Sequence, residues 1–339
     1  MTEKNKYIRQ SWVILTVFLI VVLNPVLGQK KVGTTIFQFL KVMPDAHGTG
    51  MGDAVTSTIN NANAAFYNPA GLTGVDKLDL SFSSYNYFFD IKTTSISLAY
   101  KMGLYGTLGF YYINTDIGEI EVTSVDQLGF GDDGIYNPGL TGEKINPKQM
   151  VIGLSFARPL TSQFSFGLSL KYAREDMIEA DADGILLDFG LVFKTGYRSI
   201  QTSAVIKNFG PEISYSDGEI TTNNSNFEYY PPPQTLVIGV SAFLIAPEHS
   251  LLFQSRNQSL RVAFDIIGPR DYDQQYNTGL EWGYENILFI RTGFKFNYDT
   301  QGISFGMGVG INKFRGDYSY ASYGNYLSNI HRISVGMEF

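Results

Sequence analysis

The chain has 339 residues, of which 14% are aromatic and 17% are charged, against a usual charged fraction of about 25%. Its net charge of -7 provides no basic surface for nucleic acid, so DNA and RNA are excluded as partners. The absence of cysteine excludes disulfide bonds, thiol catalysis and cysteine-ligated metals. A mean hydropathy of -0.04 excludes a helical membrane bundle but fits a β-barrel, in which every second residue faces lipid.

The first 28 residues have the three parts of a secretory signal peptide. Lys4, Lys6 and Arg9 supply positive charge, residues 12–23 form an apolar core, and small residues lead to a cleavage site after Gly28. An uncleaved anchor helix is the alternative, but the apolar run is shorter than the roughly 20 residues that span a bilayer. We therefore expect residues 1–28 to be removed on export.

Residues 29–78 show no strand pattern. They contain an apolar helical turn at 36–43, a cluster of glycines, and a stretch of small residues. The motif Gly48-x-Gly50-x-Gly52 resembles a phosphate-binding loop but lacks the strand and helix that such a loop requires, so a tightly packed turn is the expectation. A segment that cannot form its own core is predicted to fill the barrel mouth as a hatch.

Residues 79–339 repeat one unit, 8 to 11 residues of alternating apolar and small or polar side chains followed by turn residues. This predicts an all-β fold, a 14-stranded antiparallel transmembrane β-barrel with an N-terminal hatch or plug. The predicted strands begin near Asp79, Thr93, Tyr105, Met150, Phe164, Asp183, Ile200, Thr235, Ser259, Gln275, Asn286, Ile303, Phe314 and Asn329.

The alternation assigns each side chain to one face of the wall. Phe166, Leu168 and Leu170 are predicted to face lipid, whereas Gly167 and Ser169 between them face the lumen. A soluble β-sandwich is the alternative, although such folds seldom contain fourteen strands of this kind in one run. The pattern therefore favours the membrane barrel.

The connections alternate between short and long, as in bacterial barrels with short periplasmic turns and long extracellular loops. Links 114–148 and 208–234 are long and are predicted to lie outside the cell. The link at 245–258 is too long for a periplasmic turn, and either a short helix or an extra piece of strand is expected there. The final strand alternates up to Phe339, which resembles the signal read by the barrel-assembly machinery.

Charged residues of both signs occupy inward positions on three predicted strands. Such groups must pair with one another or line water, so they indicate either a structural network in the lumen or a transport site. These residues are Arg261, Asp265, Glu281, Arg291 and Lys295.

No pattern predicts catalysis, a metal or a cofactor. The three histidines, at 47, 249 and 331, are scattered along the chain, so no zinc site or catalytic triad is expected. Carboxylates cluster at 175–183, where a solvated loop and a calcium site are the two interpretations. We expect a protein that is not an enzyme.

The hatch region carries a resemblance to a known family. Phe39-Leu40-Lys41, then 50–54 (Gly-Met-Gly-Asp-Ala), then 63–72 (Asn-Ala-Ala-Phe-Tyr-Asn-Pro-Ala-Gly-Leu) resemble the start of PorV/PorQ family proteins, which belong to the wider FadL-like barrels. The resemblance implies fourteen strands around a plugged lumen. It also implies a hatch element that shapes or obstructs the lumenal path, at Asn68, Pro69, Ala70 and Gly71.

The resemblance implies a component of a type IX secretion or related export and attachment system in the bacterial outer membrane, in contact with lipid and with protein partners. Secreted cargo or a translocon would dock on the extracellular loops. The candidate docking residues are Tyr136, Pro138, Tyr229, Tyr230 and Pro231. The alternative is a FadL-like transporter of hydrophobic small molecules with the hatch as its gate, and the inward charges favour docking over it.

Overall fold

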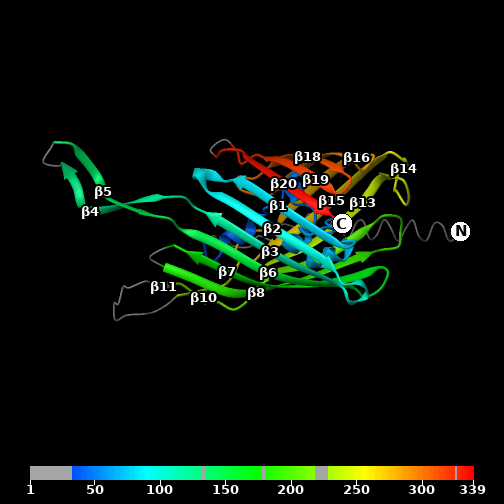
Figure 1. Ribbon diagram of the computed structural model, residues 1–339, viewed down its shortest axis with the longest axis horizontal. Helices are drawn as coiled ribbons and strands as arrows, with labels where there is room; N and C mark the ends of the chain where they lie inside the picture. Colours follow the sequence, from blue (N-terminus) through cyan, green and yellow to red (C-terminus); the bar gives the residue numbers. More distant parts are fainter. Residues whose placement is uncertain (1–32, 131–133, 178–179, 218–227, 325–326) are drawn as a thin grey trace.

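The computed structural model describes residues 33–130, 134–177, 180–217, 228–324 and 327–339 (Figure 1). The predicted signal peptide at 1–28 lies outside the described residues, as do residues 29–32 at the start of the predicted hatch. In the part of the chain that the structure describes, no helix is long and apolar enough to cross a membrane.

Within these residues, fourteen antiparallel strands close into one barrel, which confirms the predicted fold. Closure is visible at two places: β1 bonds to both β2 and β20, and β9 bonds to both β8 and β13. The strands of the wall are β1 (Leu78–Asn86), β2 (Lys92–Lys101), β3 (Thr107–Asp116), β6 (Lys148–Pro159), β7 (Phe164–Asp176), β8 (Ala180–Lys194), β9 (Gln201–Phe209), β13 (Thr235–Ala246), β15 (Gln258–Pro269), β16 (Gln275–Tyr284), β17 (Leu288–Phe296), β18 (Ile303–Ile311), β19 (Phe314–Ala321) and β20 (Ile330–Glu338).

The alternation of side chains forms the apolar belt of the barrel. In β18, Phe305 and Met307 are 49% and 56% exposed on the outer surface, whereas Ser304 is 3% exposed on the lumen side. Each strand of the wall carries similar apolar residues on its outer face, because successive side chains of a strand point to opposite faces. This outer surface suits hydrocarbon, whereas the inner surface carries small and polar residues together with the apolar residues that pack against the hatch.

The long link at 114–148 differs from the predicted loop because it forms a two-stranded ribbon of its own. Strands β4 (Ile120–Phe130) and β5 (Tyr136–Ile145) pair only with each other. Figure 1 shows this ribbon extending away from the wall, at the end of the barrel opposite the C-terminus. We call that end the loop end, and the end with the C-terminus and the short links the turn end.

Four further strands are short. β10 (Ile213–Ser214) pairs with β12 (Tyr229–Tyr230), and β11 (Ser216–Asp217) pairs with the tip of β8. β14 (Phe253–Gln254) lies in the long link of the turn end and runs parallel to β13, so this link contains an extra piece of strand, one of the two predicted possibilities.

The hatch lies inside the barrel as short helices joined by turns. Its elements are η1 (Gln38–Lys41), α2 (Ala46–Gly50), α3 (Ala64–Tyr67) and η2 (Pro69–Gly74); two further short helices, η3 (Phe88–Asp90) and η4 (Gly103–Tyr105), are turns of the wall.

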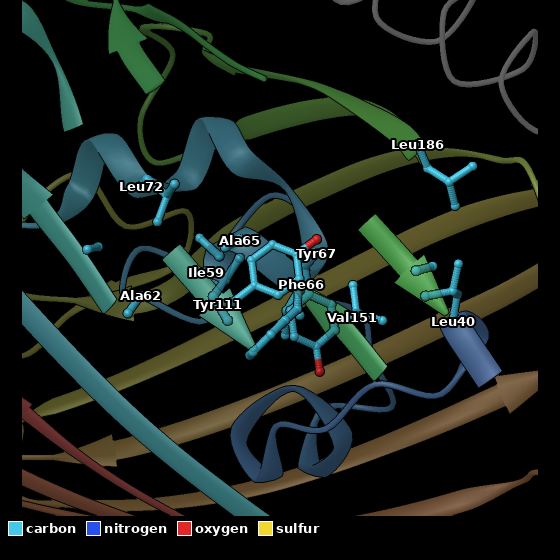
Figure 2. Close-up of a cluster of buried hydrophobic side chains, with 14 of the residues drawn as sticks. Leu40, Ile59, Ala62, Ala65, Phe66, Tyr67, Leu72, Tyr111, Val151 and Leu186 are labelled. Atoms are coloured by element: carbon cyan, nitrogen blue, oxygen red, sulfur yellow. The ribbon is translucent and has the colours of Figure 1, made fainter. Parts of the chain in front are cut away.

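The apolar core lies between the hatch and the inner wall. Figure 2 shows Phe66 of the hatch beside Tyr111 of β3, with ring centroids 5.2 Å apart in an edge-to-face arrangement. Leu72 of the hatch is fully buried. Val151 of β6 and Leu186 of β8 belong to the same buried cluster on the side of the wall. Because residues of the hatch and of the wall belong to this one cluster, the barrel and the hatch share a core. Burial of each side chain of this size stabilises the folded state by about 1.5 to 3 kcal/mol.

Candidate functional site

The hatch approaches the wall closely where the inward residues are glycines. A Cβ atom added at Gly190 of β8 would lie 2.0 Å from Oδ1 of Asn68, and one added at Gly167 of β7 would lie 2.2 Å from the backbone nitrogen of Ala70. Larger residues at these wall positions would push the hatch away. The Asn-Pro-Ala element thus lies directly on bare strand backbone.

Asn68 connects three parts of the structure. Its Nδ2 donates to the carbonyl of Thr56 at 2.8 Å and to the carbonyl of Leu191 in β8 at 3.2 Å. Its Oδ1 accepts from the backbone nitrogen of Ala70 at 3.0 Å, which caps the start of η2. The side chain is fully buried, so these bonds fasten the hatch both to itself and to the wall.

Thr56 is the second point of attachment. Its backbone nitrogen and its hydroxyl both donate to Oδ2 of Asp265 in β15, at 3.1 Å and 2.8 Å. The hydroxyl also lies 3.0 Å from Oγ of Ser203 in β9. The next residue, Ser57, accepts at its carbonyl from the side chain of Gln201 in β9. Residues 56–57, which we call the strap, are therefore held against the inner face of the wall at β9 and β15, the two strands that flank β13.

A cavity of about 310 Å³ lies between this strap and the loop end. Both apolar and polar side chains line it, and they come from the hatch and from the wall strands β9, β13, β15, β16 and β17. The lining includes Leu40, Lys41, Met43, Asp53, Thr56, Tyr67, Lys207, Asn208, Val237, Asp265, Ile267, Pro269, Tyr272, Asn277, Lys295 and Tyr298.

Charged groups of the hatch and the wall meet in this cavity. Lys295 Nζ lies 2.5 Å from Oδ2 of Asp53, and the hydroxyl of Tyr67 donates to Oδ1 at 3.2 Å. Burial raises the pKa of Asp53, but the charges of Lys295 and Arg332 and the hydrogen bonds from Lys295 and Tyr67 together bring it below the ordinary value. Lys207 Nζ approaches Met43 Sδ at 3.4 Å, and no described carboxylate forms a salt bridge with it.

Two side chains that line this cavity each have a buried oxygen atom without a hydrogen-bond partner among the described residues. These atoms are Oδ1 of Asp265 and Oδ1 of Asn277, and both side chains are at least 96% buried. Buried acceptors of this kind are rare in native proteins. The cavity can therefore accept hydrogen bonds as well as accommodate apolar groups.

A second cavity, of about 190 Å³, lies on the other side of the strap, towards the turn end. Ser57 borders it from the hatch, and Lys194, Gln201 and Arg261 border it from the wall. The main cavity is bordered by Thr56, so the strap at 56–57 separates the two spaces.

The five inward charges predicted from the sequence all lie on the lumen side but form two groups. Glu281 accepts from Arg291 Nε at 2.7 Å and lies 3.7 Å from Arg261, while Arg291 also donates to Asp317 at 2.6 Å. The other two, Asp265 and Lys295, bond to the hatch instead of to this group. The five residues therefore do not form a single network. They make two sets of contacts, because the hatch supplies the partners of Asp265 and Lys295.

The predicted docking residues fall in two different settings. Tyr136 and Pro138 lie on the projecting strand β5, where Tyr136 is 55% exposed. Tyr229 is exposed, but Tyr230 packs against the hatch core and the carbonyl of Pro231 accepts from the backbone nitrogen of Ile36 at 3.1 Å. The second long link thus covers the hatch at the loop end, with Tyr229 pointing outward.

Sequence reasoning assigned no lumenal role to Asp53, Thr56, Tyr67 or Lys207, although Asp53 and Tyr67 lie within the hatch motifs. Lys207 carried a usable signal, since it is a cation at an inward position of β9. The three hatch residues carried none, because an irregular backbone has no period from which to read the direction of a side chain.

Among the residues that the structure describes, no group of three or more His, Asp or Glu side chains is placed to hold a metal ion. Glu179, in the predicted carboxylate cluster, lies outside the described residues.

No protein family model and no curated protein matches the sequence. Solved structures do match the fold. The CymD monoaromatic hydrocarbon channel is 13% identical, with a TM-score of 0.55 over 87% of this chain and 97% of the other. The toluene transporter TodX of P. putida is 12% identical, with a TM-score of 0.55 over 86% of this chain and 97% of the other. The chain therefore has the fold of these hydrocarbon channels, and at this identity the likeness extends to the fold alone.

Proposed function

We propose that the protein is a FadL-like channel of the bacterial outer membrane that takes up small, largely apolar molecules. The sequence predicts such a transporter as the alternative to a secretion component. CymD and TodX, which share the fold, are described as channels or transporters for monoaromatic hydrocarbons and toluene.

The observation that carries this proposal is the pair of cavities separated by the strap at 56–57. The larger, of about 310 Å³, is at the lower end of the roughly 300 to 1,000 Å³ typical of small-molecule sites. Val237, Ile267 and Leu40 offer apolar contact, and the free oxygens of Asp265 and Asn277 accept hydrogen bonds. This combination suits a molecule with an apolar body and one polar donor group.

Transport is tested with a pair of neighbouring substitutions in β13. Val237 lines the cavity, whereas Ile238 is 50% exposed on the outer surface. Val237→Trp fills the cavity and is expected to abolish most uptake of radiolabelled toluene into cells that lack another FadL-type channel, while Ile238→Trp retains it. Equal uptake by both variants and by the empty-vector strain would contradict the proposal.

A second candidate function is protein docking, as the PorV/PorQ resemblance implies. The observation in its favour is the projecting ribbon, where Val125, Phe130 and Ile135 are 84%, 78% and 67% exposed. Apolar residues this exposed commonly mark interaction sites.

The two functions are separated by removing the ribbon. A variant in which an Asn-Gly turn replaces residues 117–147 is expected to take up toluene normally if transport is the function. The opposite outcome has two parts: neither protein takes up toluene, and a secretion component copurifies with the wild type but not with the variant that lacks the ribbon. That outcome would reject transport and support docking as the function.

We also propose the chain organisation of 1–28 as a signal peptide, 29–78 as the hatch and 79–339 as the barrel. N-terminal sequencing of the protein isolated from membranes is expected to begin at Gln29. A mature chain that begins at Met1 would refute the cleavage.

A further inference from the structure

Arg332 of β20 is a buried cation whose hydrogen bonds are incomplete. Its side chain is 2% exposed, and neither Nε nor Nη1 has a hydrogen-bond partner among the described residues. The guanidinium lies over the ring of Tyr85 at 4.4 Å and also interacts with Tyr323. Leaving donors of a charged group unpaired inside a protein is costly, so a further partner is expected.

Two serines on the neighbouring strands share this property. Ser319 of β19 lies directly opposite Arg332 in the strand register, and Ser304 of β18 is opposite Ala321, the next inward residue of β19. Both hydroxyls are buried without a hydrogen-bond partner. Of the seven buried side-chain atoms left unpartnered in the described residues, four therefore belong to one patch on three adjacent strands.

The patch differs from the rest of the lumen in its charge. Arg291 is paired with Glu281 and Asp317, Arg315 bonds to Asp79, and Lys295 bonds to Asp53. No described carboxylate lies within salt-bridge distance of Arg332; the nearby Asp53 is already bonded to Lys295. The patch thus combines a full positive charge with N–H and O–H donors, and this chemistry selects an anion and repels a metal cation.

A cavity of about 20 Å³ borders this patch. Arg332 and Ser304 line it from the wall, and Thr49 and Asp53 line it from the hatch. A cavity needs roughly 10 to 15 Å³ to hold one water-sized occupant, so the space admits a single small ion and excludes phosphate, sulfate or the body of a transported molecule.

We propose that Arg332, Ser304 and Ser319 form a site for one halide-sized anion, chloride in the cell, that joins the hatch to strands β18–β20. The site adjoins the main cavity, and Asp53 and Lys295 line both spaces, whereas Arg332 and Ser304 line only the smaller one. It goes beyond the proposed function and holds whether or not the barrel transports toluene.

The direct test is a crystal structure of the full-length mature barrel grown in bromide instead of chloride. An anomalous difference peak within hydrogen-bond distance of Arg332 Nε or Nη1 is expected in the wild type and is lost in Arg332→Met. Arg315→Met is the matched control, because the guanidinium of Arg315 is already bonded to Asp79. An ordered water without anomalous signal at Arg332, or a peak that persists in Arg332→Met, would overturn the proposal.

Thermal unfolding gives an independent measurement. At constant ionic strength, replacing gluconate by chloride is expected to raise the melting temperature of the wild type, since a ligand that binds only the folded state stabilises it. The shift is expected to vanish in Arg332→Met and to persist in Arg315→Met. If Arg332→Met does not fold, the Ser304→Ala/Ser319→Ala double variant is expected to show a smaller chloride shift, and a wild-type melting temperature independent of chloride rejects the site.

Discussion

At the scale of single residues, the hatch is positioned by a few buried polar side chains whose partners lie far away in the sequence. Asn68 and Thr56 bond to β8 and β15, and Ser334 of β20 accepts from the backbone nitrogen of Ala46 at 2.9 Å. A hydrogen bond requires a narrow range of distance and angle, so each of these buried contacts restricts the orientation of the hatch.

Asn68→Ala is predicted to loosen the hatch. The change removes both hydrogen bonds donated by Nδ2, and the buried carbonyl of Thr56, once left unpaired, costs about 1 to 3 kcal/mol. The expected result is a lower melting temperature and a larger ion conductance in planar bilayers. Asn60→Ala is the control, because Asn60 is an exposed asparagine of the same hatch. Equal conductance in the two variants would show that Asn68 does not hold the strap.

Asp271 is predicted to make the attachment of the hatch depend on pH. It lies in the link between β15 and β16 and accepts from Thr35, Gln38 and Lys41 of the N-terminal segment. Burial raises the pKa of Asp271, but the hydrogen bonds and charge of these partners lower it more, to a value below the ordinary 3.8.

A carboxyl whose folded pKa is depressed stabilises the folded state above its unfolded pKa, and this contribution is lost as the pH falls through the folded value. The melting temperature of the wild type is therefore expected to decrease when the pH is lowered beyond about 4. Asp271→Asn is expected to melt lower at pH 7 and to show a smaller change on acidification, whereas Asp273→Asn behaves like the wild type. Parallel pH curves for wild type and Asp271→Asn would contradict the assignment.

At the scale of elements, the β4–β5 ribbon is structurally separate from the wall. β3 and β6 pair directly as far as Asp116 and Lys148, and the ribbon adds no strand to the barrel. An isolated two-stranded ribbon is marginally stable in water, so its exposed apolar residues gain little from folding alone.

Removing the ribbon is predicted to leave the barrel intact. Joining residues 116 and 148 by a two-residue Asn-Gly turn preserves the antiparallel register of β3 and β6. The free energy of unfolding is expected to change by less than about 0.5 kcal/mol, as for surface changes away from packed features. Guanidinium unfolding of both proteins in phospholipid vesicles checks this, and loss of the folded barrel would show that the ribbon supports the wall.

At the scale of the whole molecule, the barrel separates two environments with one wall. Leu170 of β7 is 47% exposed on the outer surface, whereas its neighbours Ser169 and Lys171 are buried in the lumen. An exposed face this apolar is stable only against hydrocarbon, which fixes the surroundings of the protein.

Leu170→Arg is predicted to destabilise the barrel by about 2 to 4 kcal/mol, because it places a charge near the middle of the bilayer. Tyr197→Arg, in an exposed link of the turn end, is expected to have little effect. Equilibrium unfolding in vesicles measures both. A small effect at Leu170 would place this face against protein or water instead of lipid.

The sequence alone was sufficient for the wall. All fourteen wall strands were predicted within three residues of their observed starts, the largest difference being at β8, which begins at Ala180 and not at Asp183. This accuracy has a physical origin, since each crossing alternates between lipid and lumen with a period of two and ends at turn residues. The β4–β5 ribbon was missed because it lies beyond the bilayer, where no alternation between lipid and lumen is imposed.

The partners inside the lumen were decided only by the tertiary structure. Asp53 meets Lys295 from 242 positions away, and Thr56 meets Asp265 from 209 positions away. The hatch backbone is irregular, so its side chains have no predictable direction until the barrel closes around them. The sequence by itself therefore determined which residues of the wall face inward, whereas closure of the barrel over the hatch decided which of them meet and where the cavities remain.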